Sequence, residues 1–513
     1  MKHIQVTLAF AAFAAGLNAQ TASQAPTGTE PAVSQLPTTI VTGDLWQSEL
    51  ERTTASVTVI DDTRLATNGV QHFEDIVNAI PNLTWTGGSS RPRYIQIRGI
   101  GENSQFEGET PDSAVRFLID DLDLTGLGTV GNLFDVQQVE VLRGPQAGAF
   151  GANAAGGVIR IVTNEPTPYW TGQVEGTIGQ DNLKAGGLAV GGPIIESDPE
   201  KLTFRLALHQ LNQDGFRDNK FLGRDDTNER DELTTRLKLR WIANEDWQWD
   251  GTLLYADANN GYDEWSLNNT GFDTYSDEPG RDEQETVAGS IRGTWTGLDS
   301  IDITTITSIS DTDSLNSADG DWTNTDVIEV VDSTYTRLDR QRTRWSEELR
   351  LDSKAEEDAL GLIDRWTAGL YFEELKEHSK FGGSWSNFET DYETETFSLF
   401  AQGTHLYSEA TRLIVGIRAE HYDLTTDIQG RENVDFDDLL IGGKITLEND
   451  LSDAHMLFTS IARGYKAGGA NIYPDLGGNL PINIILKPSG ITKLACVLLF
   501  LMVQSFRNLL FFI

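Results

Sequence analysis

The sequence predicts an all-β transmembrane antiparallel β-barrel of about 13 strands, preceded by a small α+β domain. Between Thr171 and Gly464 the chain repeatedly forms segments, most of about 8 to 12 residues, in which every second side chain is apolar. Tryptophan and tyrosine recur near the ends of these segments, as in the aromatic girdles of membrane barrels. No apolar stretch before residue 476 is long enough for a membrane helix, as expected for a protein that spans with strands.

The N-terminus has the pattern of an export signal. Lys2 precedes an apolar run from Val6 to Leu17, and the small residue Ala19 comes before a polar stretch. The run is shorter than the roughly 18 residues of a membrane span, which favours a signal peptide at 1–19 over an anchor. Residues 20–37 are rich in Ser, Thr, Pro and Ala, which predicts a flexible lead within a periplasmic N-terminal segment, 20–55.

The α+β domain is predicted from residue 56 to 165, where helical and strand-like patterns are mixed. Phe73, Ile76, Val77 and Ile80 fall at helical spacing, and Pro81 ends that helix. β-branched and alternating runs predict strands at 38–43, 56–60, 94–99, 115–120, 139–144 and 158–163.

A stretch rich in glycine and alanine, "GPQAGAFGANAAGG", connects the last two of these strands. It has neither G-x-G-x-x-G nor Gly-Lys-Ser/Thr, and a β-branched run follows it, so a phosphate-binding loop is not favoured. Small residues permit tight turns and close backbone packing. We therefore expect a packing role for four glycines: Gly144, Gly151, Gly156 and Gly157.

The region 166–475 carries the barrel pattern. In "LTFRLALHQ" and "LTTRLKLRW" leucines alternate with Thr, Arg, Lys and His. A soluble sandwich or propeller would also alternate. Charged residues in mid-strand suit a wet lumen and favour the membrane barrel. The aromatic residues near strand ends are Trp241, Trp247, Tyr255, Trp295, Trp345, Trp366 and Tyr407.

Charge and composition exclude several function classes. The chain has 39 Lys and Arg against 78 Asp and Glu, a net charge of −39 that would repel nucleic acid. Its one cysteine, Cys496, permits no disulfide framework or thiolate metal site. The seven histidines form no H-E-x-x-H motif, and no G-x-S-x-G elbow is present, so no catalytic residue and no metal ligand is predicted. The acidic segment 310–326 lacks the ligand order of an EF-hand and is expected to be a solvated loop.

Three segments resemble one family. "TTIVTG" at 38–43, "VEVLRGPQAGAFGANAAGGVIRIVT" at 139–163 and "ARGYKAGGAN" at 462–471 are similar to motifs of the TonB-dependent outer-membrane receptors of the siderophore-receptor type. The resemblance covers about residues 38–473. It implies that the α+β domain, 56–165, is a plug inside the lumen of a barrel that has 22 strands in the family. It also implies an energised inner-membrane partner that pulls on the plug.

The resemblance also implies residue roles. The periplasmic strand that pairs with the inner-membrane partner, the TonB box, would be Thr38, Thr39, Ile40, Val41 and Thr42. The plug arginines Arg98 and Arg143 would pair with barrel carboxylates, for which Glu348 and Glu420 are candidates. Ligand contacts in the apical plug loops would come from Arg91, Arg93, Gln105 and Phe106. Solvated lumen or loop side chains are the alternative for these candidates.

The function that this resemblance implies is energy-dependent import of a scarce ligand, in most cases a ferric siderophore. The expected partners are a TonB-type inner-membrane complex, the ligand and outer-membrane lipid, with no nucleic acid. A monomer in the cell outer membrane is expected, and iron would enter in the chelate, without a resident cofactor. The alternatives are uptake of cobalamin, an oligosaccharide or another organic solute, and a surface adhesin or structural barrel without transport.

The family pattern stops near Leu476. No acidic residue occurs from 476 to 513, and "LACVLLFLMVQSFRNLLFFI" shows no strand alternation. Gln504, Ser505, Arg507 and Asn508 interrupt its apolar run, which disfavours a membrane helix. We expect an atypical, out-of-frame or truncated C-terminus. About 13 strands would leave unpaired edges in lipid, so a non-functional fragment is a further alternative.

Overall fold

The computed structural model describes residues 40–41, 45–46, 48–86, 88–102, 111, 113–267, 271–327, 335–354, 363–383, 387–430, 433–452, 455–470 and 485–486. The predictions for the signal peptide and the lead lie outside these residues, as do Thr38, Thr39 and Thr42 of the predicted box. The predicted tail lies outside them as well, except for Ile485 and Leu486. Within the described part of the chain, no helix is long and apolar enough to cross a bilayer.

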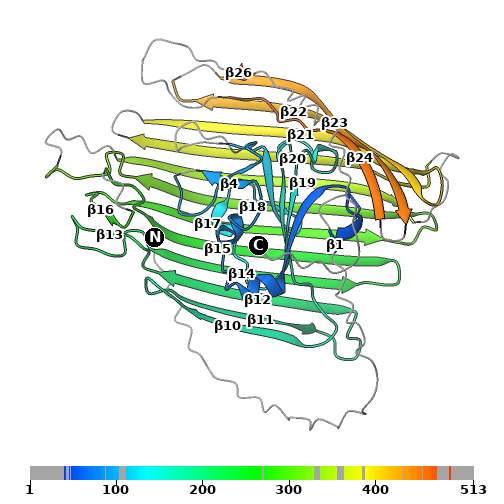
Figure 1. The fold of residues 1–513 in the computed structure, drawn as a ribbon, viewed down its shortest axis with the longest axis horizontal. Coiled ribbons are helices and arrows are strands. Elements are labelled where there is room, and N and C mark those ends of the chain that lie inside the picture. The colour runs from blue at the N-terminus through cyan, green and yellow to red at the C-terminus, as the bar shows by residue number, and fades with distance from the viewer. Residues whose placement is uncertain are drawn as a thin grey trace, which may run out of the picture. The chain divides into compact units, whose positions relative to one another are not determined.

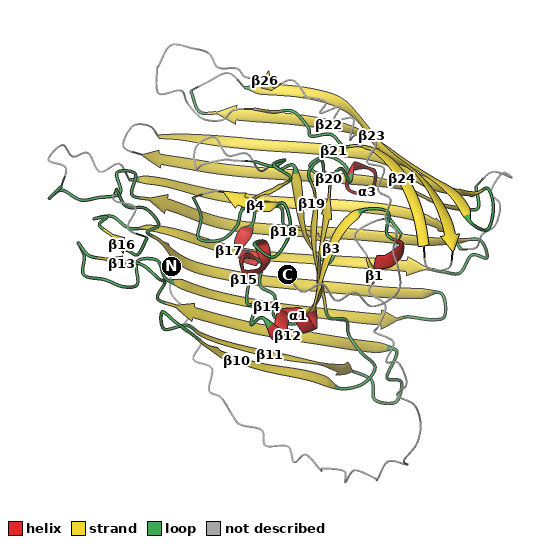
Figure 2. Cartoon of the chain, viewed as in Figure 1, coloured by secondary structure: helices red, strands yellow, loops and turns green. Residues whose placement is uncertain are grey.

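The plug domain is a five-stranded sheet with three short helices (Figures 1 and 2). The strand order is β3-β8-β9-β6-β7, and only the β6–β9 pair is parallel. A separate hairpin joins β4 to β5. The elements are β3 (Ser56–Asp61), α1 (Asp62–Thr67), α2 (Glu74–Val77), β4 (Leu83–Thr86), β5 (Tyr94–Ile97), β6 (Val115–Ile119), β7 (Leu122–Asp123), η2 (Gly128–Val130), β8 (Val136–Arg143), α3 (Ala147–Phe150) and β9 (Gly157–Thr163).

Two plug helices were not expected from the sequence. Helix α1 follows β3 directly, and its N-cap residue Asp61 accepts a hydrogen bond from the backbone N–H of Arg64. Helix α3 lies within the glycine and alanine stretch. Both helices have six residues or fewer, which is too short for a helical period to show in the sequence.

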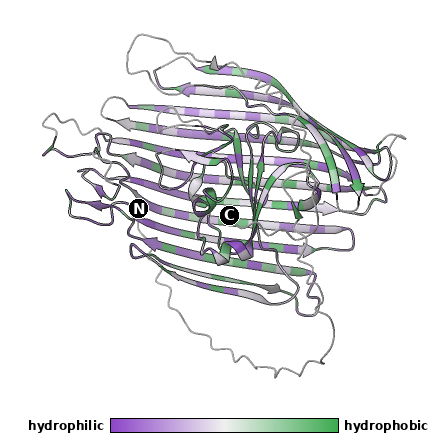
Figure 3. Cartoon of the chain, viewed as in Figure 1, coloured by the Kyte–Doolittle hydropathy of each residue, from purple (hydrophilic) through white to green (hydrophobic). Residues whose placement is uncertain are grey.

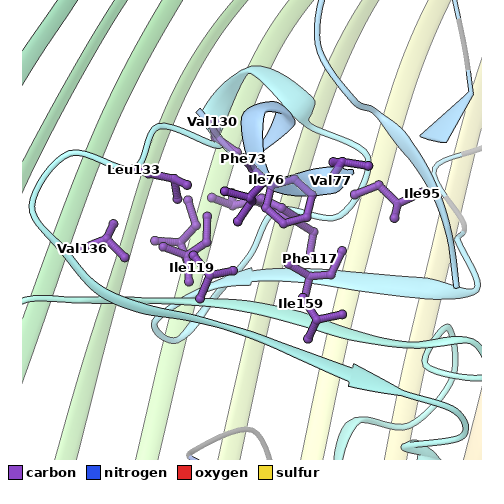
Figure 4. Packing of buried hydrophobic residues seen from close by; sticks show 14 of the residues in the cluster. Phe73, Ile76, Val77, Ile95, Phe117, Ile119, Val130, Leu133, Val136 and Ile159 are labelled. Carbon is purple, nitrogen blue, oxygen red and sulfur yellow. The ribbon is translucent and has the colours of Figure 1, made fainter. Parts of the chain in front are cut away.

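The plug core continues into the barrel wall. Phe73 and Phe117 pack edge to face, with ring centroids 5.4 Å apart, among buried Ile, Leu and Val side chains (Figure 4). Leu254, Ala256 and Ala288 of the barrel belong to the same buried cluster. The plug and the wall are therefore joined by apolar packing as well as by polar contacts.

The barrel domain is a single antiparallel sheet of 13 strands, which confirms the predicted fold class. Neighbours in the sequence are neighbours in the sheet, with β10 and β24 as the outer strands of the described sheet. The strands are β10 (Thr171–Ile178), β11 (Lys184–Pro193), β12 (Leu202–Gln213), β14 (Arg230–Ile242), β15 (Trp247–Tyr262), β17 (Gly280–Trp295), β18 (Ile301–Ala318), β19 (Thr336–Ser353), β20 (Arg365–Gly383), β21 (Asn387–Leu406), β22 (Thr411–Ile428), β23 (Val434–Ser452) and β24 (His455–Arg463).

Among the described residues, six further two-residue strands and one short helix lie outside the two main sheets. They are β1 (Ile40–Val41), β2 (Ser48–Glu49), η1 (Leu50–Arg52), β13 (Asp218–Asn219), β16 (Asp273–Thr274), β25 (Gly469–Ala470) and β26 (Ile485–Leu486), paired as β1–β2, β13–β16 and β25–β26.

Alternation along the strands separates two faces of the sheet (Figure 3). In β21 the side chains of Thr394, Thr396 and Ser398 are buried, whereas Phe397 and Leu399 are exposed. The buried polar positions face the plug, and the exposed apolar positions form the outer wall, as a lipid-facing barrel requires.

The strands from β18 to β23 are longer than the sequence indicated, with 18 to 20 residues each. The expected length of about 8 to 12 residues is wrong for them because hydropathy alternates only where one face meets lipid. Beyond that level the outer face is charged while the pairing continues, as at Glu389, Asp391 and Glu393 of β21. The segment 310–326, expected to be a loop, accordingly begins as the end of β18.

Aromatic side chains mark the two borders of the apolar band. Trp247 stacks against Trp249 and Trp295 at one border, with centroids 5.4 and 5.8 Å apart. Tyr255 lies eight residues further along β15, about 26 Å at strand spacing. This separation fits the apolar belt of a membrane barrel, about 25 Å tall.

Gly157→Val tests the close packing of the plug strands. A Cβ at Gly157 would lie 2.2 Å from the carbonyl oxygen of Leu142, and its φ of +149° is unfavourable for other residues. We expect the plug to lose about 2 to 3 kcal/mol of unfolding free energy, measured by calorimetry of the purified protein in detergent. Gly176→Val, where a Cβ meets no atom within 4 Å, is the matched control. Equal unfolding temperatures in the two variants would contradict the packing role.

Candidate functional site

The candidate site is the interface between the plug and the polar face of the barrel sheet. In Figure 1 the short strands β13 and β16 lie at one end of the barrel strands and β1 at the other. The plug lies against the sheet between these ends (Figure 2).

Arg91 and Arg93 are the strongest plug contacts to the wall near the β13 end. The Nε and Nη2 atoms of Arg91 each donate to one carboxylate oxygen of Glu232 at 2.7 Å, and Nη1 donates to Glu74 at 2.9 Å. Arg93 Nη2 lies 3.3 Å from Asp282 Oδ1. Both arginine side chains are buried, so the expectation that they lie open to an external ligand is wrong. Their charges are neutralised by the barrel wall.

Other pairs have the opposite polarity, with plug carboxylates and barrel cations. Asp135 accepts hydrogen bonds from Arg205, with Nε 2.8 Å from Oδ2. Asp121 accepts from Arg292 Nε at 2.9 Å, and Asp123 Oδ2 lies 2.7 Å from Arg344 Nη1. Further pairs join Asp120 to Lys238, Glu74 to Arg230 and Glu102 to Lys466. The plug is thus held by charges of both signs on both partners.

The plug carboxylates are held in the ionised form. Burial alone would raise the pKa of Asp121, but the guanidinium groups of Arg292 and Arg160 outweigh it and lower the pKa to about 2. Burial also opposes ionisation of Asp123, and its neighbours Arg344 and Arg116 lower its pKa. Both carboxylates stay charged at neutral pH, which their barrel partners require.

The predicted latch arginines do not reach the predicted carboxylates. Arg143 donates to the hydroxyls of Ser56 at 3.1 Å and Thr58 at 2.7 Å within the plug. Burial and the nearby Arg98 lower its pKa. Glu348 pairs with Arg350 on its own strand. Among the described residues, neither Arg98 nor Arg143 pairs with Glu348 or Glu420: Arg143 is bound within the plug, and Arg98 is exposed.

Glu420 does hold the plug, but through backbone. Its Oε1 accepts a hydrogen bond from the N–H of Ala152 at 2.9 Å, and its Oε2 accepts from Ser398 at 2.7 Å and from Arg418 Nε at 3.0 Å. This close approach needs a residue without a side chain. A Cβ at Gly151 would lie 2.4 Å from Glu420 Oε2. The glycine and alanine stretch therefore docks directly on the barrel wall.

The other glycines of this stretch are crowded to different degrees. A Cβ at Gly156 would lie 3.0 Å from the carbonyl oxygen of Ile100 and from Val115 Cγ2. At Gly144 the nearest atom would be Arg98 Nη1, at 3.6 Å, and the φ of +99° is the stronger constraint there.

The described part of the predicted TonB box is β1, which pairs with β2. The carbonyl of Ile40 also accepts a hydrogen bond from Gln138 of the plug at 2.7 Å, and Val41 is fully buried. Trp46 donates to Thr367 of β20 at 2.7 Å, and the Arg365 guanidinium lies 4.6 Å from its ring centroid. This segment is thus bound both to the plug and to the end of the barrel that lies away from β13.

Sequence reasoning missed the plug carboxylates. Asp120, Asp121 and Asp123 follow the apolar run "VRFLI" directly, in "VRFLIDDLDL". Three acidic residues beside a strand buried in a lumen indicate partners on the surrounding wall, and this signal was present in the sequence. The two other ligand candidates, Gln105 and Phe106, lie outside the described residues.

One group of carboxylates has metal-like spacing within the described residues. Glu374, Glu393 and Glu395 lie on the outer face of β20 and β21. Lys376 pairs with Glu374 at 2.8 Å and with Glu393 at 3.0 Å, so a cation already occupies this position.

Glu232→Gln tests the buried charge pair. It leaves the Arg91 guanidinium buried without its main counter-charge, and we expect a loss of about 3 kcal/mol in the free energy of plug unfolding, measured in urea. Asp226→Asn, which breaks an exposed pair with Arg224, is the control and is expected to lose less than about 1 kcal/mol. The double variant Arg91→Met/Glu232→Leu should recover part of the loss; no recovery would show that the charge pair is not its source.

The pH dependence of plug stability follows from the lowered pKa of Asp121. The carboxylate stabilises the folded plug above its unfolded pKa, about 3.9, and this contribution disappears as the pH falls to about 2. In Asp121→Asn the unfolding temperature should therefore fall less between about pH 5 and pH 2 than in the unmodified protein. Asp225→Asn, at an exposed loop position, should keep the original slope. An unchanged slope in Asp121→Asn would refute the assignment.

Comparisons with known proteins agree with this architecture. Residues 49–158 match the family model "TonB-dependent Receptor Plug Domain", and residues 183–489 match "TonB dependent receptor-like, beta-barrel". The pesticin receptor of Yersinia enterocolitica is 25% identical over 459 residues, covering 82% of this chain and 62% of the relative. The iron-regulated outer membrane virulence protein of Vibrio cholerae O395 is 26% identical over 274 residues, covering 51% of this chain and 40% of the relative. The chain thus spans about three fifths of the length of the pesticin receptors that it matches.

Solved structures show the same fold. The ferric yersiniabactin uptake receptor FyuA of Yersinia pestis aligns with a TM-score of 0.69 and 22% identity, covering 82% of this chain and 66% of that one. The alcaligin receptor FauA of Bordetella pertussis aligns with a TM-score of 0.64 and 16% identity, and the alignment covers 84% of this chain and 66% of FauA. The chain belongs to the TonB-dependent receptors, with a plug domain docked on the inner face of a β-barrel domain.

Proposed function

We propose that this protein is a monomeric outer-membrane receptor that binds a ferric siderophore and imports it with energy from a TonB-type inner-membrane complex. The relatives named as siderophore or iron-regulated receptors support the ligand class. Iron enters as part of the chelate, and no resident cofactor is required.

One observation carries the proposal: the plug is bound to the barrel wall near β13 and to β1 near the other end of the barrel strands. Near β13 it is bound through Arg91 and Arg93, and at the other end Gln138 binds β1. A pull on β1 is therefore transmitted to the plug, whose contacts with the wall include buried ion pairs. Buried ion pairs are strong while both partners are in place and are lost together when one partner moves.

Two other transport substrates and one non-transport function remain as alternatives to be separated by experiment. Cobalamin or an oligosaccharide would use the same plug and the same inner-membrane partner. An adhesin would need neither. The TonB box distinguishes the transport functions from the adhesin, because only a transporter depends on this segment.

Deletion of residues 38–43 tests the proposal. In cells that depend on the chelate for iron, we expect uptake of radiolabelled ferric siderophore to fall to background, with binding at the cell surface unchanged. The energy input acts through this segment, whereas the external loops bind the ligand. Ser23→Pro, in the lead before the box, is the control and should leave uptake intact.

Unchanged uptake in the deletion variant would contradict the proposal and favour the adhesin. Box-dependent uptake of cobalamin or a sugar, without growth on chelated iron, would keep the transporter but reject the siderophore.

A further inference from the structure

Three outer loops are linked to one another through buried polar groups. They connect β12 to β14 (214–229), β15 to β17 (263–279) and β18 to β19 (319–335). Asn219 donates to Asp263 at 3.0 Å and to the Ser276 hydroxyl at 3.0 Å, and Thr274 donates to Asp263 at 2.7 Å. These four side chains are buried, which makes the first two loops one ordered unit.

The third loop is attached to this unit. Asn324 donates to the carbonyl of Tyr275 at 2.8 Å, and the N–H of Asp277 donates to the carbonyl of Thr323 at 3.0 Å. Trp265 and Trp322 stack with ring centroids 5.8 Å apart and an angle of 26° between the planes. We call the described residues of the three loops, 214–229, 263–267, 271–279 and 319–327, the loop platform.

The loop platform exposes large apolar side chains. Trp265 is 50% exposed and Trp322 is 41% exposed although the two stack on each other. The other exposed members are Phe216, Phe221, Leu222, Leu267, Phe272 and Val327. Aromatic side chains held open on an ordered surface mark a binding surface, because soluble loops rarely keep so many of them exposed.

The charge of the same surface is strongly negative. Within the loop platform, residues 214–229 have five carboxylates and three cations. The described residues 263–267, 271–279 and 319–327 have eight carboxylates and no cation. A surface of one sign repels a ligand of the same sign and attracts the opposite one.

The few cations near this surface are already paired. Arg217 lies 3.4 Å from Glu264, Arg224 lies 2.7 Å from Asp226, and Lys220 pairs with Asp218 and Asp273. Arg91 and Arg93, at the apex of the plug, are bound to Glu232, Glu74 and Asp282. An anionic ligand would therefore have to break an existing ion pair to gain a counter-charge.

We propose that the ligand of this receptor is a ferric chelate without net negative charge, neutral or cationic, held by stacking on the aromatic side chains of the loop platform. This inference rests on the proposed function. A trisanionic complex, such as iron bound by three catecholates, is repelled by the platform. A cationic group gains from the surrounding carboxylates and from the faces of Trp265 and Trp322.

The test is a charge series on one chelate. Gallium complexes of a linear trihydroxamate are prepared with a free terminal amine (net charge +1), an acetylated amine (0) and a succinylated amine (−1), and binding to the full chain is measured by calorimetry. We expect affinity at low salt to fall at least about tenfold from +1 to −1, and the difference to shrink near 0.5 M salt because exposed charges are screened.

The outcomes separate the two proposals. Tighter binding of the −1 complex, or of a gallium triscatecholate, than of the +1 complex would overturn the charge inference and leave the siderophore receptor intact. Failure of every gallium chelate to bind would overturn both.

Two variants locate the effect on the loop platform. Asp225→Lys/Asp326→Lys reverses two exposed charges and should reduce the difference in affinity between the +1 and −1 complexes, because the loop platform then carries fewer negative and more positive charges. Trp265→Ala should weaken binding of all three complexes about tenfold. Trp247→Ala, in the stacked aromatic group at the opposite border of the apolar band, is the matched control and should bind normally. Equal binding by Trp265→Ala and Trp247→Ala would reject the platform as the binding surface.

Discussion

The structure depends on opposite charges that are buried together between the plug and the barrel. Each carboxylate or guanidinium at this interface has lost most of its water, which is unfavourable unless a counter-charge takes the place of the water. The barrel positions that face the plug are therefore charged in a pattern that only this plug can satisfy. Without Asp135 and Asp123, the buried Arg205 and Arg344 would lose counter-charges, and the half-buried Arg292 would lose Asp121. The plug and the wall specify one relative position through these requirements.

Close approach of backbone to wall supplies the second constraint. Glu420 reaches the N–H of Ala152 only because Gly151 carries no side chain, and Gly157 allows β9 to pass the carbonyl of Leu142. These contacts are short-range and directional, whereas the ion pairs act over a longer range. Together they favour a plug that is displaced by losing whole groups of contacts in discrete steps.

Much of the fold can be predicted from the sequence. The partners of the charged residues between plug and barrel can be predicted to a smaller extent. Alternation found the 13-stranded sheet because a side chain that faces lipid and one that faces a polar lumen differ at every second position. It failed for the outer parts of β18 to β23, where the outer face no longer meets lipid and carries charged side chains, as at Glu389 and Asp391. The roles of single residues are harder to predict from the sequence than the strands are. The family resemblance implies that Arg91 and Arg93, in the apical plug loops, contact a ligand, whereas only the three-dimensional fold brings Glu232 and Asp282 to them. Arg143 was assigned to the wall, yet its partners are Ser56 and Thr58 on the adjacent plug strand.

The length of the outer strands has a consequence for where the protein meets its surroundings. The 20 residues of β21 extend about 66 Å along the strand, whereas the apolar belt of such barrels is only about 25 Å tall. Even with strongly tilted strands, the wall extends well beyond the lipid headgroups. At that height, several Debye lengths of about 8 Å separate the loops from the charged membrane surface. The surface potential of the membrane is screened there, so the electric field that an approaching molecule meets first is that of the protein's own carboxylates.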